Sequence, residues 1–267
     1  MKVSIVIAGV SGKTAVSNCI ASIQRCAGDL DIDLVVIHGA PDAVFQIRMQ
    51  GIEQATGDRI AVIGDRYEAT PSWFRALFGE RVFDMTGGCV APSPSLNYWG
   101  WCVYLSEYAH VAPPVVDSTI ADPKSLMGGN VVYSSFLVRR VELAPDDTDL
   151  SFHERLLQEN ASAGILGALE LLYAYPPRFL EYIRERFEFS RAIARSRRGM
   201  WRLLVVPFLP LIVIWRTAAS VILKRRYRLR FLLCSPAIVC LAFAQAVGEC
   251  IGVLESLFIS QNRKIQS

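Results

Sequence analysis

The sequence predicts an α/β domain, built on a mostly parallel sheet flanked by helices, followed by a helical tail. Short β-branched apolar runs alternate with segments of helical periodicity through the first half of the chain. After Pro176-Pro177 the composition changes to basic residues and long apolar stretches. Strands that are separated by helices pair in parallel through right-handed crossovers, so this order favours a parallel sheet between helices.

The elements of the first domain follow from local patterns along the chain. Compact apolar runs rich in valine and isoleucine are typical of buried strands, whereas apolar residues three and four apart are typical of helices. Strands are expected at Val3–Ile7, Leu34–Ile37, Ile60–Ile63, Val82–Val90 and Val131–Tyr133, and helices at Thr14–Arg25, Ala43–Thr56 and Ser72–Phe78. Asp146–Asp149 suits the N-cap of a further helix. Between Ala91 and Met127 the pattern loosens, and no regular element is predicted.

Charge is distributed unevenly along the chain. The formal net charge is +3, but the segment from Arg184 to Arg230 holds 13 Lys/Arg and two acidic residues, a balance of +11. The remainder has 15 basic and 23 acidic residues, a balance of −8. Because the basic residues lie beside long apolar runs, they favour an anionic membrane surface over nucleic acid as the partner.

The tail carries two apolar segments separated by a basic loop. A basic helix is expected at Arg178–Arg202, and the apolar segments are Leu203–Trp215 and Phe231–Gly248. The second is an uncharged run of 18 residues, just long enough to span a bilayer. A true hairpin would place the basic loop at residues 224–230 opposite the first domain, against the positive-inside tendency. In-plane or re-entrant helices therefore fit the charges better, and a buried soluble core is the third alternative. The predicted domains are residues 1–180 and 181–267.

Cysteine usage and the N-terminus indicate a reducing compartment. Seven cysteines without C-x-x-C spacing suggest neither a disulfide framework nor a structural zinc site. The first residues enter a strand pattern directly and lack the apolar core of a signal peptide. The first domain is therefore expected on the cytosolic face of a membrane.

One motif indicates a nucleotide-binding alternative. Gly9-Val10-Ser11-Gly12-Lys13-Thr14 follows a strand and precedes a helix, as a phosphate-binding P-loop does. A P-loop needs four residues between its glycines, and only Val10 and Ser11 lie between these two. The loop is too short to wrap phosphates, so a P-loop protein is the weaker alternative.

The order of motifs over nearly the whole chain resembles family-2 glycosyltransferases of the GT-A type. Ser4–Gly9 is similar to the family's S-V-V-I-P-x strand, Leu34–Asp42 to V-V-D-x-G-S-x-D, and Arg48–Gly51 to R-N-x-G. Ile37 falls where the family has the aspartate that contacts the base. The resemblance implies a nucleotide-sugar donor site; its expected residues are Ala8, Gly9, Val10, Gly39, Arg48, Gly64 and Arg66.

Asp65 is the central residue of this resemblance. Gly64-Asp65-Arg66 lies where the family has D-D-D or D-x-D, which holds Mg²⁺ or Mn²⁺ against the donor diphosphate. Pro71 and Trp73 keep the family's spacing after it. Asp65 is therefore expected to be the metal ligand, and Arg66 to take over part of the electrostatic work. The alternative is an Asp–Arg pair at a strand end without function.

The resemblance also implies an acceptor side and a catalytic base. Trp99–Tyr108 is similar to W-x-x-Y-x-x-E-Y, and Gly128–Tyr133 to G-x-N-x-x-Y, so Trp99, Gly129 and Asn130 are the acceptor-side candidates. Asn130 is otherwise a turn residue. An inverting transfer needs a carboxylate to take the acceptor's proton. Glu154 is the first candidate, with a solvated helix face as its alternative; Asp147 is the reserve, with helix capping as its alternative.

The prediction for the whole chain is an inverting glycosyltransferase. It is expected to move a sugar from a nucleotide-sugar donor to a membrane-proximal acceptor, either lipid-linked or a polysaccharide of the cell envelope. The tail adds to the resemblance, with Arg191, Ala194 and the segment Ala246–Val253 in familiar order. The rival is a non-catalytic, glycosyltransferase-like membrane module, because the metal motif is reduced to one aspartate.

Overall fold

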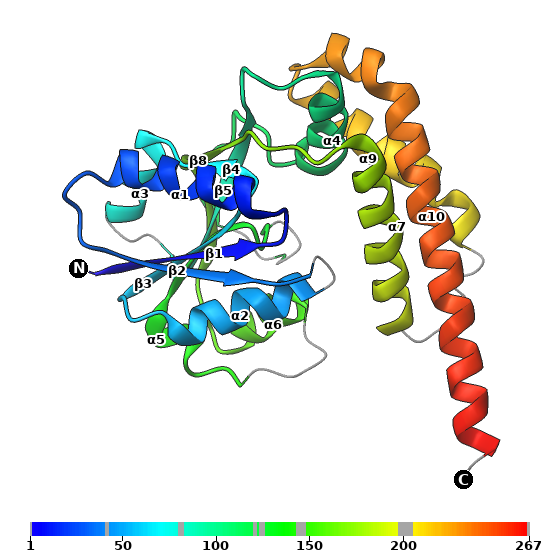
Figure 1. Cartoon of the computed structure of the whole chain (residues 1–267), viewed down its shortest axis with the longest axis horizontal. Helices are drawn as coiled ribbons and strands as arrows, with labels where there is room; N and C mark the ends of the chain where they lie inside the picture. The colour runs from blue at the N-terminus through cyan, green and yellow to red at the C-terminus, as the bar shows by residue number, and fades with distance from the viewer. Residues whose placement is uncertain are drawn as a thin grey trace. The chain divides into compact units, whose positions relative to one another are not determined.

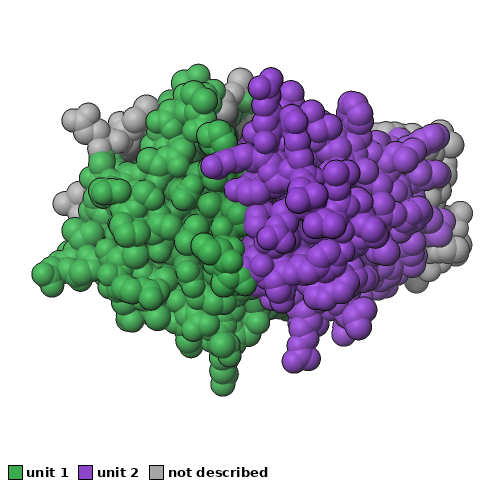
Figure 2. Space-filling view, turned by 90° about the horizontal axis from the view of Figure 1, so that it is seen from above, with its two compact units in different colours: residues 1–95, 111–175 green, residues 96–110, 176–267 purple. Residues whose placement is uncertain are grey.

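The structure is a computed structural model that describes residues 2–40, 43–79, 83–119, 122, 126–142, 148–196 and 205–265. It divides the chain into two compact units, coloured separately in Figure 2. The first, an α/β unit, comprises residues 1–95 and 111–175, and the second, a helical unit, comprises residues 96–110 and 176–267. The predicted boundary near residue 180 therefore misses one feature: the segment 96–110 belongs with the tail.

The α/β unit is built on an eight-stranded mixed sheet with the strand order β2-β1-β3-β7-β5-β8-β4, and β6 pairs with β8 (Figure 1). Its strands are β1 (Val3–Gly9), β2 (Ile32–His38), β3 (Arg59–Gly64), β4 (Tyr67–Glu68), β5 (Met85–Pro92), β6 (Ser118–Thr119), β7 (Asn130–Ser134) and β8 (Ala163–Tyr173). The three longest pairings, β1–β2, β1–β3 and β5–β8, are parallel. The predicted fold class is confirmed.

Helices cover both faces of this sheet (Figure 1). They are α1 (Lys13–Ala27), α2 (Val44–Gln54), α3 (Pro71–Phe78), α5 (Ser135–Val138) and α6 (Asp149–Gln158). In Figure 1, α1 and α3 lie on one face, whereas α2, α5 and α6 lie on the other. The helix α3 begins where its sequence indicates, because Thr70 caps the Trp73 N–H and Pro71 occupies the first turn.

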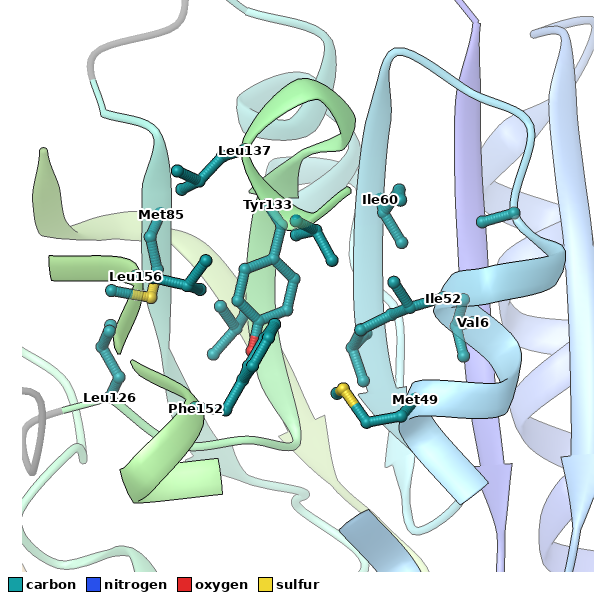
Figure 3. Packing of buried hydrophobic residues seen from close by; sticks show 14 of the residues in the cluster. Val6, Met49, Ile52, Ile60, Met85, Leu126, Tyr133, Leu137, Phe152 and Leu156 are labelled. Atoms are coloured by element: carbon teal, nitrogen blue, oxygen red, sulfur yellow. The ribbon is translucent and has the colours of Figure 1, made fainter. Parts of the chain in front are cut away.

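The main core fills the space between the sheet and the helices α2, α5 and α6. Phe45 and Met49 from α2 and Phe152 from α6 pack here against Val62 of β3 and Tyr133 of β7. The rings of Tyr133 and Phe152 meet edge to face with centroids 6.0 Å apart (Figure 3). This packing fixes α6 against the sheet, which determines where the start of that helix lies.

The helical unit contains an unpredicted helix as well as the expected tail. Its elements are α4 (Tyr98–Tyr108), α7 (Phe179–Ser196), η3 (Val206–Phe208), α9 (Leu209–Leu223) and α10 (Arg228–Ile265). Asn97 caps α4 by accepting a hydrogen bond from the Gly100 N–H at 2.8 Å. Apolar residues are spread around most of α4, so no single amphipathic face marks the helix in the sequence.

Two glycines explain how α7 and α10 pack. A Cβ on Gly248 would lie 2.3 Å from the Phe187 carbonyl oxygen, and one on Gly252 would lie 2.3 Å from that of Arg191. Small residues four positions apart let two helix backbones approach closely. Glu255 accepts hydrogen bonds from Arg191 and Arg195, which holds the same helices together one turn further on. The tail motif that contains Gly248 and Gly252 is thus a packing motif.

Two helical segments are long and apolar enough to cross a membrane. They are Val206–Leu223, with mean hydropathy 1.9, and Arg228–Ser256, with mean hydropathy 2.0. Only 22% of the first and 44% of the second is buried. Large apolar side chains stand exposed along both, among them Leu211, Trp215, Leu223, Leu229 and Leu232. Length and composition alone are weak evidence for membrane association, but they agree with the predicted tail.

Candidate active site

The candidate site lies at the edge where β1, β2 and β3 end and β7 begins. The Gly39 N–H donates to the Gly9 carbonyl at 3.2 Å, and the Gly64 N–H donates to the Gly129 carbonyl at 3.2 Å. Four glycines predicted from separate motifs therefore meet at one edge of the sheet. Carboxyl ends of parallel strands are where open α/β sheets bind ligands, so this edge is the candidate active site. Ala8 is buried one position before it.

Asp65 follows β3 directly and is almost completely buried, with 1% of its surface exposed. Its Oδ2 accepts hydrogen bonds from the backbone N–H groups of Val10 (2.8 Å) and Ser11 (2.6 Å). Its Oδ1 accepts from Ser11 Oγ at 2.9 Å. Hydrogen bonds to a charged group stabilise a fold by about 1.5–3 kcal/mol each. Asp65 is thus the residue that holds the loop between β1 and α1.

Arg66 is fixed to the same loop. Its Nε donates to Ser11 Oγ at 2.7 Å, so the Ser11 hydroxyl links the Arg66 guanidinium to the Asp65 carboxylate. The Arg66 carbonyl accepts from the N–H groups of Ala174 and Tyr175, just beyond β8. Backbone and side chain are both anchored, which keeps a positive charge at the candidate site.

A divalent cation fits Asp65 poorly. Both carboxylate oxygens face donors, and two of those donors are backbone amides that cannot rotate away. Within the described part of the chain, no group of three or more His, Cys, Asp or Glu side chains is placed to hold a metal ion. The nearby Glu68 carboxylate accepts a hydrogen bond from the Tyr175 hydroxyl. Three of the about four lone-pair sites of the Asp65 carboxylate are therefore used inside the protein, which leaves little capacity for the predicted metal ion.

Burial and the two acids shape the chemistry of one neighbouring thiol. Cys19 Sγ donates to the Gly64 carbonyl at 3.8 Å on the inner side of β3. Burial, followed by the charges of Asp65 and Glu68, raises the pKa of Cys19 to about 12. This thiol is therefore protonated near neutral pH and is not a nucleophile in the site.

A second arginine reaches the edge from α2. Arg48 Nη1 and Asp149 Oδ2 form an ion pair of 2.5 Å, with 13% and 29% of the two side chains exposed. A Cβ on Gly128 would lie 2.3 Å from both Arg48 Nη1 and Asp149 Oδ1, so any larger residue there would displace the side chains of this ion pair. The buried Arg48 Nε has no hydrogen-bond partner among the described residues. Arg48 was predicted from its motif; Asp149 as its partner was not.

Asn130 has a structural role in this geometry. Its Nδ2 donates to the carbonyls of Cys89 (3.0 Å) and Leu169 (2.9 Å), and its Oδ1 accepts from Trp73 Nε1 (3.1 Å). The side chain is buried and bridges the point where the register between β5 and β8 shifts, after Gly88. Because both amide hydrogens are already bonded, the predicted contact with an acceptor has no support in this arrangement.

One of the two candidate bases, Glu154, lies among the described residues. Glu154 is exposed, whereas its neighbours Phe152 and His153 are buried, so Glu154 lies on the outward face of α6. The residue of α6 that reaches the edge is Asp149, one helical turn before His153 on the inward face. Asp147 lies outside the described residues. The N-cap of α6 is Thr148, which accepts from the Ser151 N–H, so capping of this helix does not need Asp147.

His153 is part of the core and not of the site. Its Nε2 and the Tyr133 hydroxyl are 2.7 Å apart in a buried hydrogen bond. Burial lowers the pKa of His153 to about 4, although the Asp149 carboxylate opposes the shift, so the imidazole is neutral at pH 7. This pair fixes α6 against β7.

Trp99 belongs to the helical unit. It lies on α4, stacks on Phe179 with ring centroids 4.2 Å apart, and is 43% exposed.

A cavity at the opposite edge of the sheet, lined by Arg59, Leu77 and Phe83, holds only about 20 Å³. This cavity volume admits one water molecule and excludes a sugar.

Ser11 and Asp149 are the two residues of this edge that the sequence did not indicate as functional. Ser11 was visible only as part of a shortened P-loop pattern, and Asp149 only as a helix start. Their importance arises from partners 54 and 101 residues away, respectively.

Comparison with known structures shows the fold. The chain is similar to mannosyltransferase PcManGT from Pyrobaculum calidifontis in complex with GDP-Man and Mn²⁺: the TM-score is 0.50 and the identity 14%, over 96% of this chain and 87% of that one. It also matches S. aureus TarS 1–349 in complex with UDP-GlcNAc (TM-score 0.47, 10% identity, 93% and 90% covered). No family model and no curated protein matches the chain. The α/β unit thus has a glycosyltransferase fold of the GT-A type.

Proposed function

We propose that this protein is a glycosyltransferase that uses a nucleotide-sugar donor. The observation that carries the proposal is the edge of the sheet, where the backbone of Gly9, Gly39, Gly64 and Gly129 meets beside the guanidinium groups of Arg48 and Arg66. Glycine backbone lets a ligand approach closely, and arginine recognises phosphate oxygens with two parallel hydrogen bonds. The similar structure of mannosyltransferase PcManGT contains GDP-Man, a nucleotide-sugar of this class.

We infer an inverting reaction with a carboxylate base. The acceptor hydroxyl loses its proton to the base and attacks the anomeric carbon, while the bond from that carbon to the diphosphate oxygen breaks and the nucleoside diphosphate leaves. The outward position of Glu154 makes it a poor base, and Asp149 is engaged by Arg48. Asp147, two residues before Asp149 in the sequence, is therefore the base that we propose.

The helical unit supports a membrane-proximal acceptor. Exposed apolar residues of α9 and of the first turns of α10 flank a segment with five basic residues at 224, 225, 226, 228 and 230. Apolar side chains beside a cluster of cations are typical of helices that lie in the interface of an anionic leaflet. We propose this in-plane arrangement on the cytosolic face, with a lipid-linked sugar or a membrane-bound polysaccharide as acceptor.

The test is transfer from labelled UDP-, GDP- and dTDP-sugars to acceptor lipids in vesicles. We expect one nucleotide class to support turnover and Asp147→Asn to lower it about 100-fold or more, because a general base contributes about 10²–10⁴ in rate. Glu154→Gln, the matched control, should retain the wild-type rate within about twofold, since solvated surface groups add little. Equal loss in both variants, or product with retained configuration, would contradict the assignment. Donor binding without any turnover would support the non-catalytic module.

A further inference from the structure

We infer that this chain binds the diphosphate of its donor without a divalent cation, through the Arg66 guanidinium that Ser11 and Asp65 hold in place. The inference rests on the proposed function, since it concerns how the same site neutralises its donor. It departs from the expectation that Asp65 holds a metal ion, and it follows from the hydrogen-bond donors that surround this carboxylate.

Most of the lone-pair sites of the Asp65 carboxylate are already occupied inside the protein. A carboxylate offers about four lone-pair sites, and three of them accept from Val10 N–H, Ser11 N–H and Ser11 Oγ–H. All three donors present positive hydrogens to the carboxylate at the point where a cation would need to approach. Reaching Asp65 would require opening the loop between β1 and α1, because only 1% of the residue is exposed.

The composition of the motif supports the same assignment. A hard cation bound beside a diphosphate takes one or two carboxylates as protein ligands. The residues on either side of Asp65 are Gly64, which has no side chain, and Arg66, which repels a cation. Within the described ranges, no group of three or more His, Cys, Asp or Glu side chains is placed to hold a metal ion. The motif therefore combines one carboxylate with one guanidinium, where related motifs carry two or three carboxylates.

The Ser11 hydroxyl makes this charge part of one unit. Its O–H donates to Asp65 Oδ1, and its oxygen accepts from Arg66 Nε, so the hydroxyl bridges the carboxylate and the guanidinium. Asp65 thereby orients Ser11, and Ser11 orients Arg66. Asp65 and Ser11 are positioning residues in this arrangement, and Arg66 is the group that meets the leaving diphosphate. Such a fixed cation stabilises developing negative charge without reorganising during the reaction.

The test is calorimetric binding of UDP, GDP and dTDP to the purified chain, in buffer with EDTA and in buffer with Mn²⁺. For the diphosphate that binds, we expect dissociation constants that agree within about threefold between the two buffers. Arg66→Gln should weaken binding about ten- to a hundred-fold, the loss expected for a charged hydrogen-bonding group. Arg75→Gln, an exposed arginine on α3, is the matched control and should bind as the wild type does.

The outcomes separate this inference from the proposed function. Binding that is at least about tenfold tighter with Mn²⁺ overturns the inference and leaves the function intact. Unchanged affinity in a folded Arg66→Gln variant also overturns it. Absence of binding to all three nucleotides in both buffers overturns the proposed function itself. The comparison of buffers uses only the wild-type chain, so it decides the question even where a variant fails to fold.

Discussion

Replacing Asn130 with aspartate tests whether this residue holds the sheet together or contacts a substrate. The two side chains have the same shape, so the change exchanges one NH₂ donor for an oxygen. In the native structure that NH₂ donates to two buried carbonyls, those of Cys89 and Leu169. A Cβ on Gly88 would lie 2.3 Å from Asn130 Nδ2, which shows how little room is left for a water molecule.

The cost of Asn130→Asp follows from these contacts. An unsatisfied buried polar group costs about 1–3 kcal/mol, so two carbonyls facing an oxygen cost about 2–6 kcal/mol. Protonating the buried aspartate restores at most one of the two hydrogen bonds. We therefore expect a loss of stability of about 2–6 kcal/mol, a large share of what a domain typically has.

The assay is urea unfolding of the full-length chain in detergent, followed by circular dichroism. Asn97→Asp is the control, because Asn97 is an exposed N-cap whose acceptor oxygen remains after the change, and it should shift stability by less than about 0.5 kcal/mol. Wild-type stability in Asn130→Asp, together with reduced transfer, would refute the structural role and restore the acceptor-side assignment.

Two further predictions concern pH and membranes. His153 has a folded pKa of about 4 against an ordinary value of 6.5, so below pH 6.5 the unfolded chain binds the proton first and stability falls as the pH falls towards 4. Between pH 7 and pH 5 the free energy of unfolding should fall by roughly 2 kcal/mol, measurable as a shift of the urea midpoint that a folded His153→Gln variant lacks. An equal dependence of the urea midpoint on pH in both proteins would contradict the burial argument. Flotation with vesicles should show binding to anionic lipid that high salt weakens. Trp215→Glu, at a site 74% exposed on α9, should lower that binding about tenfold, whereas Phe136→Glu, 67% exposed on the α/β unit, should not; equal loss in both variants would argue against the tail as the membrane-binding surface.

Local pattern determined much of the α/β unit. The strands β1, β2 and β3 and the helices α1 and α3 lie within two or three residues of their expected ranges, because each is a compact apolar run or a periodic segment. The helix α4 and the strand β8 were missed. Apolar residues are spread around most of α4, and β8 contains a register shift that disturbs its alternation.

For the candidate site, motif order and strand ends located the edge of the sheet but not the roles of its residues. The sequence by itself determined that Gly9, Gly64 and Asp65 lie at the carboxyl ends of β1 and β3, because a strand carries its terminal residues to a fixed edge. Only the tertiary structure decided which groups Asp65, Asn130 and Asp149 bind. Their partners are 55, 57 and 101 residues away, and hydrogen-bond geometry over such separations depends on how the elements pack, which no local pattern records.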